Sequence, residues 1–254
     1  MRKKVVKKRI KVKRKPKSSS KKKLIKIERV PSGIIGLDRL MEGGFVKGSS
    51  NLVSGSAGTG KTIFCSQFIW EGLKRGESCM FITLEERPED ILGDIERFGW
   101  DFQKYIDEKK LFLMYKDPFQ ITDITSPLLD EIKEKDVQRV AIDSTAVFGM
   151  YYKEPFEIRK QLLKLLNGLK DTGVTSVLTS ELTEQPVTLA KFGVEEFVAD
   201  GVIILHFVGI GGESFANLQI RKMRRTKHAN SWLPMKVTNN GLHIGKGERS
   251  VLLK

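Results

Sequence analysis

The stretch NLVSGSAGTGKT, residues 51–62, decides the fold of this chain. Its last eight residues match GxxxxGKT, the pattern of a phosphate-binding loop between a strand and a helix. Glycines let such a loop turn its backbone N–H groups around an anion, and the helix that follows places its positive N-terminus beneath the phosphates. Lys61 can reach the β- and γ-phosphates of a nucleotide, and the Thr62 hydroxyl can ligate Mg²⁺. The residues expected to bind nucleotide are Gly55, Ser56, Ala57, Gly58, Thr59, Gly60, Lys61 and Thr62.

The residues on both sides of this loop support the interpretation. Residues 51–54 are predicted to form a strand, and residues 62–74 show apolar side chains at helical spacing before a stop signal at Arg75-Gly76. Further along, strand-like runs alternate with helical ones, which indicates an α/β fold with a mostly parallel sheet. The predicted strands are 78–84, 111–115, 139–142 and 174–179, and the predicted helices are 88–98, 123–135 with Asp123 as N-cap, and 156–171.

The pattern changes after Gly201. Residues 201–209, 215–223 and 233–238 are predicted to be strands with short links, which indicates an antiparallel C-terminal extension of the sheet. The glycines at 209, 211 and 212 favour a hairpin turn, with a flexible loop at a ring pore as the alternative. Because no internal repeat is present, we interpret residues 24–254 as one domain.

A carboxylate follows one of the predicted buried strands. Asp143 comes directly after the apolar run 139–142. Ligands of parallel α/β sheets bind at the carboxyl ends of the strands, and in P-loop NTPases a carboxylate at such a position holds Mg²⁺, usually through water. The alternative is an ordinary turn or helix-capping aspartate.

Two adjacent carboxylates, Glu85 and Glu86, follow the predicted strand 78–84. If that strand neighbours the phosphate-loop strand, both side chains face the γ-phosphate, where a carboxylate can polarise the attacking water as a general base. Neighbouring acids raise each other's proton affinity, which suits a base that works near neutrality. The alternative is a solvated pair offset by Arg87.

The segment Thr179-Ser180-Glu181 also ends a predicted strand. We expect Ser180 to lie near the nucleotide and to respond to the γ-phosphate. A plain turn at the end of the strand is the alternative.

The charge of the chain is concentrated in its first 23 residues. Of 45 Lys and Arg residues, 14 lie in residues 1–23, which contain no acidic residue, whereas residues 24–254 balance 31 basic with 31 acidic residues. We expect residues 1–23 to be a disordered basic tail. Such a tail can bind nucleic acid or another polyanion, including an anionic membrane surface, but without aromatic residues it would not read sequence. A solubilising tail or a wrongly assigned start codon are the alternatives.

Other residues argue against several classes of protein. Cys65 and Cys79 are the only cysteines and are expected to be buried, reduced thiols in a cytoplasmic protein. No apolar run is long enough for a transmembrane segment, and no apolar region follows the basic start as in a secretory signal. His206 is expected to be a satisfied core residue. The tryptophans Trp70, Trp100 and Trp232 are too scattered in sequence to predict a base-stacking platform.

Six segments together carry a resemblance to a known family. They are GSAGTGKT, FITLEERPEDI, RVAIDS, TSELTEQ, KFGVEEFVADGVIIL and QIRKMRRTKH. Over about residues 26–245 the chain resembles the KaiC-like branch of the RecA/RadA superfamily. Because each motif occurs once, it is similar to the single-domain KaiC homologues of archaea rather than to the two-domain clock protein. The resemblance implies a RecA-like P-loop NTPase fold.

The resemblance also implies roles for particular residues. ATP and Mg²⁺ are the expected ligands, Glu85 and Glu86 the catalytic glutamates, and Asp143 the residue on the Mg²⁺ side. The family forms rings, usually hexamers, with ATP at subunit interfaces, and Lys222 and Arg224 match its pair of cations that contact the γ-phosphate of a neighbour, with Thr226 and His228 beside them. A basic strand edge or polyanion patch is the alternative for residues 221–228. Two glutamates, Glu195 and Glu196, occupy the positions of the clock protein's phosphoacceptors, so autophosphorylation there is not expected.

Three functions remain open from the sequence. The first is a ring-forming, Mg²⁺-dependent ATPase, regulatory or signalling, with an unknown protein partner. The second is a RadA-like DNA-handling ATPase, which the basic tail favours and the neutral body disfavours. The third is a nucleotide-gated scaffold without hydrolysis, against which the intact pair of glutamates argues.

Overall fold

The computed structural model describes residues 26–117, 125–182, 195–210 and 213–245. The basic tail, Asp123, Gly211 and Gly212 lie outside the described residues. In chain order the elements are β1 (Arg29–Val30), η1 (Asp38–Met41), β2 (Phe45–Val46), β3 (Ser50–Gly55), α1 (Lys61–Lys74), β4 (Cys79–Thr83), α2 (Pro88–Glu96), α3 (Phe102–Asp107), β5 (Leu111–Tyr115), α4 (Thr125–Glu134), β6 (Arg139–Asp143), η3 (Thr145–Val147), α5 (Phe148–Tyr151), α6 (Pro155–Thr172), β7 (Thr175–Glu181), α7 (Glu195–Val198), β8 (Gly201–Ile210), β9 (Glu213–Met223), β10 (Trp232–Thr238) and β11 (Gly241–Ile244).

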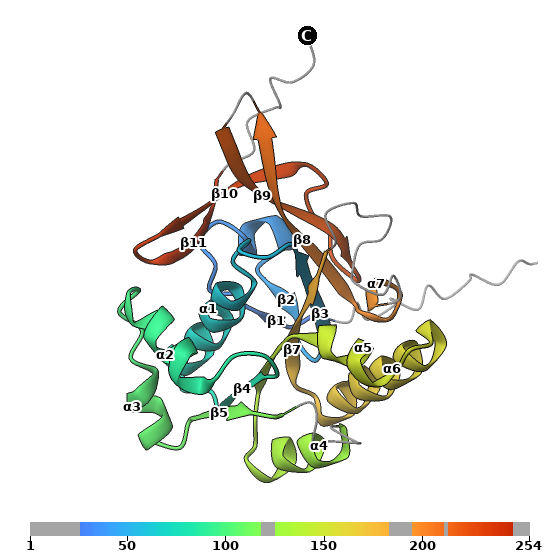
Figure 1. The fold of residues 1–254 in the computed structure, drawn as a ribbon. Helices are drawn as coiled ribbons and strands as arrows, with labels where there is room; N and C mark the ends of the chain where they lie inside the picture. The colour runs from blue at the N-terminus through green and yellow to red at the C-terminus, as the bar shows by residue number, and fades with distance from the viewer. Residues whose placement is uncertain (1–25, 118–124, 183–194, 211–212, 246–254) are drawn as a thin grey trace, which may run out of the picture.

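The predicted α/β architecture is confirmed. A nine-stranded sheet has the order β11-β10-β9-β8-β3-β7-β6-β4-β5, and β1 and β2 form a separate ribbon. The strands from β8 to β5 are parallel, and antiparallel pairing begins where β9 joins β8. The ladder of β8 and β9 continues to Ile210 and Glu213, as the hairpin interpretation expects. Figure 1 shows β9 and β10 extending beyond the helix-covered part of the sheet.

Helices cover both faces of the central parallel strands β3, β4, β6 and β7, so those strands are buried along most of their length, while the edge strand β5 is only partly buried. Every residue of β3 and β4 is buried, which explains the mainly apolar sequence of β4, whereas β3 also buries the polar Ser50, Asn51 and Ser54. One core cluster packs α1, α2 and α3 against one face, and a second packs α4 and α6 against the other. The α6 helix begins at Pro155 and ends at Thr172, and Gly173 caps it with a left-handed φ of 81° that suits glycine. Its buried side is Ile158, Leu162, Leu165, Leu166 and Leu169.

One premise of the sequence interpretation is wrong. The strand before Glu85, β4, does not neighbour the phosphate-loop strand β3, because β7 and β6 lie between them. The α1 helix nevertheless packs against β4, β6 and β7, so its first turn lies over the ends of strands beyond β3. The acidic pair can therefore reach the loop through the position of α1 rather than through neighbouring strands.

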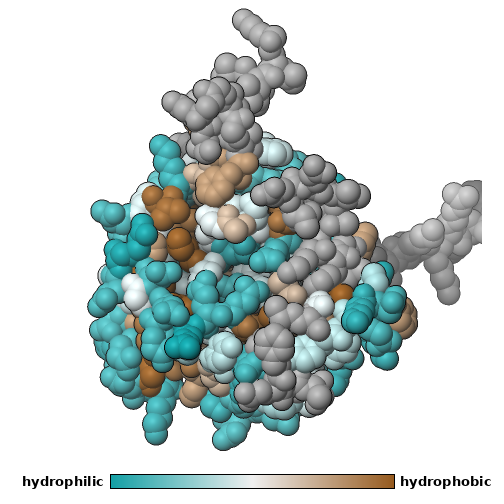
Figure 2. All heavy atoms as spheres, in the orientation of Figure 1, coloured by the Kyte–Doolittle hydropathy of each residue, from teal (hydrophilic) through white to brown (hydrophobic). Residues whose placement is uncertain are grey.

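Trp70 and Trp100 stack with their ring centroids 6.3 Å apart. Trp100 is buried and Trp70 is partly buried against the core, so this pair is a packing contact and not a base-stacking platform. One further expectation needs correction. His206 is not a satisfied core residue, because its Nε2 is buried and has no hydrogen-bond partner among the described residues, while its ring stacks on Trp232 at 4.5 Å. The space-filling view in Figure 2 shows a mainly hydrophilic face with small, separate hydrophobic patches.

The thiols of Cys65 and Cys79 are buried and free, as predicted. Burial raises the pKa of Cys79 to about 12, so this thiol remains protonated and unreactive. No helix among the residues that the structure describes is long and apolar enough to cross a bilayer.

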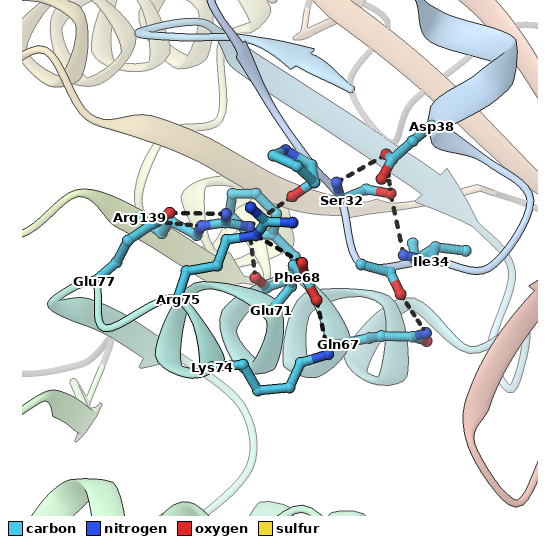
Figure 3. A network of polar contacts seen from close by, with 12 residues as sticks. Ser32, Ile34, Asp38, Gln67, Phe68, Glu71, Lys74, Arg75, Glu77 and Arg139 are labelled. Atoms are coloured by element: carbon cyan, nitrogen blue, oxygen red, sulfur yellow. Dashed lines mark hydrogen bonds and ion pairs between the residues drawn. The ribbon is translucent and has the colours of Figure 1, made fainter. Parts of the chain in front are cut away.

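The buried Arg139 side chain fixes α1 to the sheet. The Arg139 side chain is fully buried, and its Nε donates to Glu77 Oε2 at 2.5 Å. The same guanidinium donates to the carbonyls of Pro31 at 2.7 Å and Phe68 at 3.1 Å. Figure 3 shows Arg139 between Glu77 and the Phe68 turn of α1. These bonds join β6, α1 and the N-terminal segment, and thereby hold the helix that carries the phosphate loop.

Candidate nucleotide-binding site

The phosphate loop joins β3 to α1, as predicted. β3 ends at Gly55 and α1 begins at Lys61, and both Gly58 (φ 74°) and Gly60 (φ 91°) have left-handed backbone angles that favour glycine. Lys61 Nζ donates to the carbonyls of Gly55 and Ser56, each at 3.0 Å. Its ammonium therefore lies over the loop, where a phosphate bound by the loop N–H groups would meet it.

The residues of the expected metal site lie together. Thr62 Oγ1 donates to Asp143 Oδ2 at 2.7 Å, and Thr179 Oγ1 donates to the other oxygen, Oδ1. The carbonyl of Asp143 also accepts the backbone N–H of Leu84 at 2.7 Å, which ties β6 to the end of β4. A hydroxyl beside a carboxylate is a set of hard oxygen donors that suits Mg²⁺, which usually takes one or two protein groups together with phosphate oxygens.

The two glutamates differ in their surroundings. The Glu85 carboxylate accepts a short hydrogen bond from the Ser144 hydroxyl. The backbone of Glu86 is fixed by Thr83, whose hydroxyl accepts from Glu86 N at 3.0 Å and donates to Glu86 O at 2.7 Å. Among the described residues no hydrogen bond uses the Glu86 carboxylate, so it is the freer of the two to contact water.

Glu86 has the acid–base character expected of a general base. Partial burial raises the pKa of its carboxyl above the ordinary value, and the negative charge of Asp143 adds to this rise, followed by Asp94, Glu85 and Asp90. A carboxylate with a raised pKa binds a proton more strongly, which makes it a better acceptor near neutral pH.

One cavity of about 320 Å³ collects these groups. Glu181, at the end of β7, also lines it, although sequence reasoning chose the neighbouring Ser180. Because side chains alternate along a strand, Thr179 and Glu181 lie on one side of β7 while Ser180 points away and donates to Glu195 at 3.0 Å. The cavity is lined by Ala57, Gly58, Gly60, Lys61, Thr62, Ile63, Thr83, Glu85, Glu86, Asp143 and Glu181.

Sequence reasoning gave no separate role to Thr83, Thr179 or Ser144. Thr179 and Ser144 donate to the carboxylates of Asp143 and Glu85, and Thr83 holds the backbone of Glu86. Each stands at or just after the carboxyl end of a strand that was predicted correctly. That position is the signal that could have identified them, because the carboxyl ends of parallel strands form the binding edge of the sheet.

The basic residues at the end of β9 and just after it lie outside this cavity. Lys222 on β9 pairs with Val202 on β8, which pairs with Leu52 on β3. Lys222 is therefore two strands away from β3, level with a residue that lies three positions before the end of β3 at Gly55. That is about 10 Å along the sheet and about 10 Å across it. Arg224 donates to Asp200 Oδ1 at 3.2 Å, toward the end of β3 opposite to the loop.

Thr226 and His228 are also remote from the chain's own cavity. Thr226 Oγ1 accepts from Arg29 Nη1 at 2.5 Å, and His228 Nδ1 lies 3.0 Å from the carbonyl of Ala229. The cavity of the same chain is therefore not lined by Ser180, Lys222, Arg224, Thr226 or His228.

A phosphate loop in a mostly parallel sheet, with a Thr–Asp pair and an acidic pair at the same sheet edge, defines a RecA-like P-loop nucleotide-binding domain. The profile of the family described as "ATPase: KaiC" matches residues 30–249. The chain therefore belongs to the KaiC ATPase family.

Individual relatives agree with this assignment. The circadian clock oscillator protein KaiC of Picosynechococcus sp. is 36% identical over 241 residues, covering 90% of this chain and 46% of that protein. KaiC of Parasynechococcus marenigrum is 36% identical over 231 residues, covering 87% and 45%. The chain thus spans about half the length of the curated relatives it matches. The crystal structure of the KaiC-like protein PH0186 from Pyrococcus horikoshii OT3 superposes with a TM-score of 0.79 at 38% identity, covering 87% of this chain and 100% of that one.

Proposed function

We propose that this protein hydrolyses ATP with Mg²⁺. We further propose that it acts as a ring, a homohexamer, in which each active site is completed by the neighbouring subunit. The observation that carries the proposal is the single cavity that brings Lys61, Thr62, Asp143 and Glu86 together. A phosphate loop alone would support nucleotide binding. The carboxylate placed across the cavity from the loop supports hydrolysis.

Each group in the cavity has a role in this reaction. The loop N–H groups and Lys61 bind the β- and γ-phosphates, and Thr62 with Asp143 holds Mg²⁺, Asp143 through water. When bound, the ion neutralises charge on the phosphate oxygens. Glu86 accepts the proton of the attacking water, while Glu85, oriented by Ser144, helps to place that water.

The position of Lys222 and Arg224 supports action between subunits. Both lie toward the end of the sheet opposite to their own phosphate loop, so they cannot contact a nucleotide bound there. In a head-to-tail ring the same residues would face the open side of the next subunit's cavity and neutralise charge on the transferring phosphoryl group. Thr226 and His228 follow them in the chain and would lie near the same nucleotide.

The test is phosphate release from ATP over a range of protein concentrations, with particle mass measured in parallel. Specific activity should rise with concentration and saturate as rings form, and Lys61→Ala should abolish turnover. Lys222→Ala should lower turnover without preventing assembly. Retained turnover in Lys61→Ala would overturn the assignment, and ATP-driven assembly without phosphate release would favour the nucleotide-gated scaffold.

The basic tail motivates a second proposal, a polyanion-binding role for residues 1–23 in a regulatory cytoplasmic ATPase. Binding to nucleic acid through phosphates alone should weaken steeply with salt and be lost when residues 1–23 are deleted. Turnover stimulated by DNA at physiological salt would favour the DNA-handling function. A lack of nucleic-acid binding at low salt would contradict both the DNA-handling function and the polyanion-binding role of residues 1–23.

A further inference from the structure

The short helix α7 holds the ammonium of Lys222. Lys222 Nζ donates to the carbonyls of Glu196 at 3.0 Å and Ala199 at 2.7 Å. Carbonyls at the end of a helical turn lack helical partners and favour such a cation. A lysine ammonium has three N–H donors, and these two bonds fix its position while leaving a third for a phosphate oxygen.

The α7 helix cannot hold its own position. It contains only four residues, Glu195–Val198, and so short a helix has little stability apart from its packing. Val198 packs into the core cluster that contains α6. At the other end Glu195, which is 2% exposed, accepts the hydrogen bond of the Ser180 hydroxyl at 3.0 Å. A buried hydrogen bond to a carboxylate is among the stronger ones in a protein.

Ser180 connects α7 to the nucleotide cavity. It lies on β7 between Thr179, which donates to Asp143, and Glu181, which lines the cavity. It also pairs with Ser54, the residue before the phosphate loop. Ser180 thus links the cavity end of β7, through Glu195, to the helix that holds Lys222.

We propose that Ser180 and Glu195 are positioning residues for Lys222. Through them, the expected Mg²⁺ site of a subunit, at Asp143, is coupled to the Lys222 ammonium that this subunit supplies to the next subunit's nucleotide. This inference rests on the proposed function, because it requires Lys222 to act on the next subunit's nucleotide. In this proposal Ser180 acts from the side of β7 that faces away from the phosphates, and not by the direct contact with the nucleotide that was expected from the sequence.

The test uses Ser180→Ala and Glu195→Ala, with Ser176→Ala as the matched control. Ser176 lies four residues earlier on the same face of β7, and its hydroxyl is buried with no hydrogen-bond partner among the described residues. We expect kcat for ATP to fall about tenfold in the first two variants with an unchanged KM, since a neighbouring cation acts on the transition state. Ser176→Ala should keep normal kcat, and Glu195→Gln, which retains an acceptor oxygen, should recover most of it.

Mixed rings separate positioning from a general structural effect. Coexpression with Lys61→Ala subunits, which lack their own activity but carry an intact Lys222, should restore turnover to Ser180→Ala, as it should to Lys222→Ala. If Lys61→Ala rescues Lys222→Ala but not Ser180→Ala, the defect lies in the subunit's own cavity and this inference is wrong while the proposed function stands. If it rescues neither, the intersubunit site is wrong and the inference falls with it. Normal kcat in Ser180→Ala would also overturn the inference.

Discussion

Replacing Glu86 by Gln should separate catalysis from binding in this site. The backbone of Glu86 is held by both hydrogen bonds to Thr83, so the change should remove the proton acceptor while leaving the strand end in place. A positioned general base contributes about 10²–10⁴-fold to a rate, and we expect kcat to fall about 10³-fold. That loss corresponds to about 4 kcal/mol in the activation free energy. KM for ATP should remain near normal, because the loop and Lys61 bind the phosphates.

The two glutamates provide controls for each other. Glu85 is hydrogen-bonded to Ser144, and Gln would keep an acceptor oxygen for that bond, so Glu85→Gln should cost only about tenfold in kcat through the loss of its charge. The pH profile gives a second readout. Because Glu86 must be ionised to accept a proton and its pKa is raised, wild-type kcat/KM should increase with pH through a pKa above 4.5. This acidic limb should disappear in Glu86→Gln.

Stability should change in the opposite direction to activity. A carboxyl whose pKa is higher in the folded than in the unfolded protein favours the folded state only while it is protonated, and that contribution is lost as the pH rises through the folded pKa. At pH 7 the neutral Gln should therefore give a modest rise in Tm, which should vanish below the ordinary pKa of 4.5. Steady-state assays of phosphate release measure the loss of turnover, and thermal-unfolding assays measure the change in Tm. Turnover above half of wild type in Glu86→Gln, or a larger loss in Glu85→Gln, would refute the assignment of the base.

Three further changes test the metal site and the frame around it. Thr62→Val should raise the Mg²⁺ concentration needed for half-maximal turnover, with recovery in Thr62→Ser, because only the hydroxyl contacts Asp143; an unchanged Mg²⁺ requirement would contradict the site. Glu77→Gln should lower the free energy of unfolding by about 3 kcal/mol in denaturant titrations, since it leaves the buried Arg139 without its counterion. Glu28→Gln, in an exposed pair that solvent screens, should leave the free energy of unfolding nearly unchanged. Gly72→Ala should lower Tm, because a Cβ would lie 2.6 Å from Arg139 Cδ and 2.7 Å from Cys79 Sγ. Gly93→Ala, in open space within α2, should instead raise Tm, since Ala favours a helix more than Gly does. Equal changes in Tm in the two variants would contradict the packing around Gly72.

The parts of the site that follow from local sequence were predictable. The loop, the helix after it and the carboxylates at strand ends each carry their signal within a few residues. Strand order does not, because it depends on which hydrophobic faces pack together, and β4 was placed beside β3 in the premise for Glu85 when two strands separate them. The direction of a side chain at a strand end is also hard to predict. Choosing Ser180 rather than Glu181 was an error of one residue, and along a strand one residue reverses the face.

The separation between Lys222 and the phosphate loop of the same chain suggests a reason for sharing the proposed active site between two subunits. A cation built into the same subunit would be in place whenever the chain is folded, so turnover could not depend on assembly. Here Lys222 lies about 10 Å along and about 10 Å across the sheet from the loop, and Arg224 is paired with Asp200. A cation supplied by the neighbour instead makes hydrolysis depend on the contact between subunits. In the proposed ring, the hydrogen bond from Ser180 to Glu195 would provide a short physical route by which occupancy of one cavity changes the activity of the next.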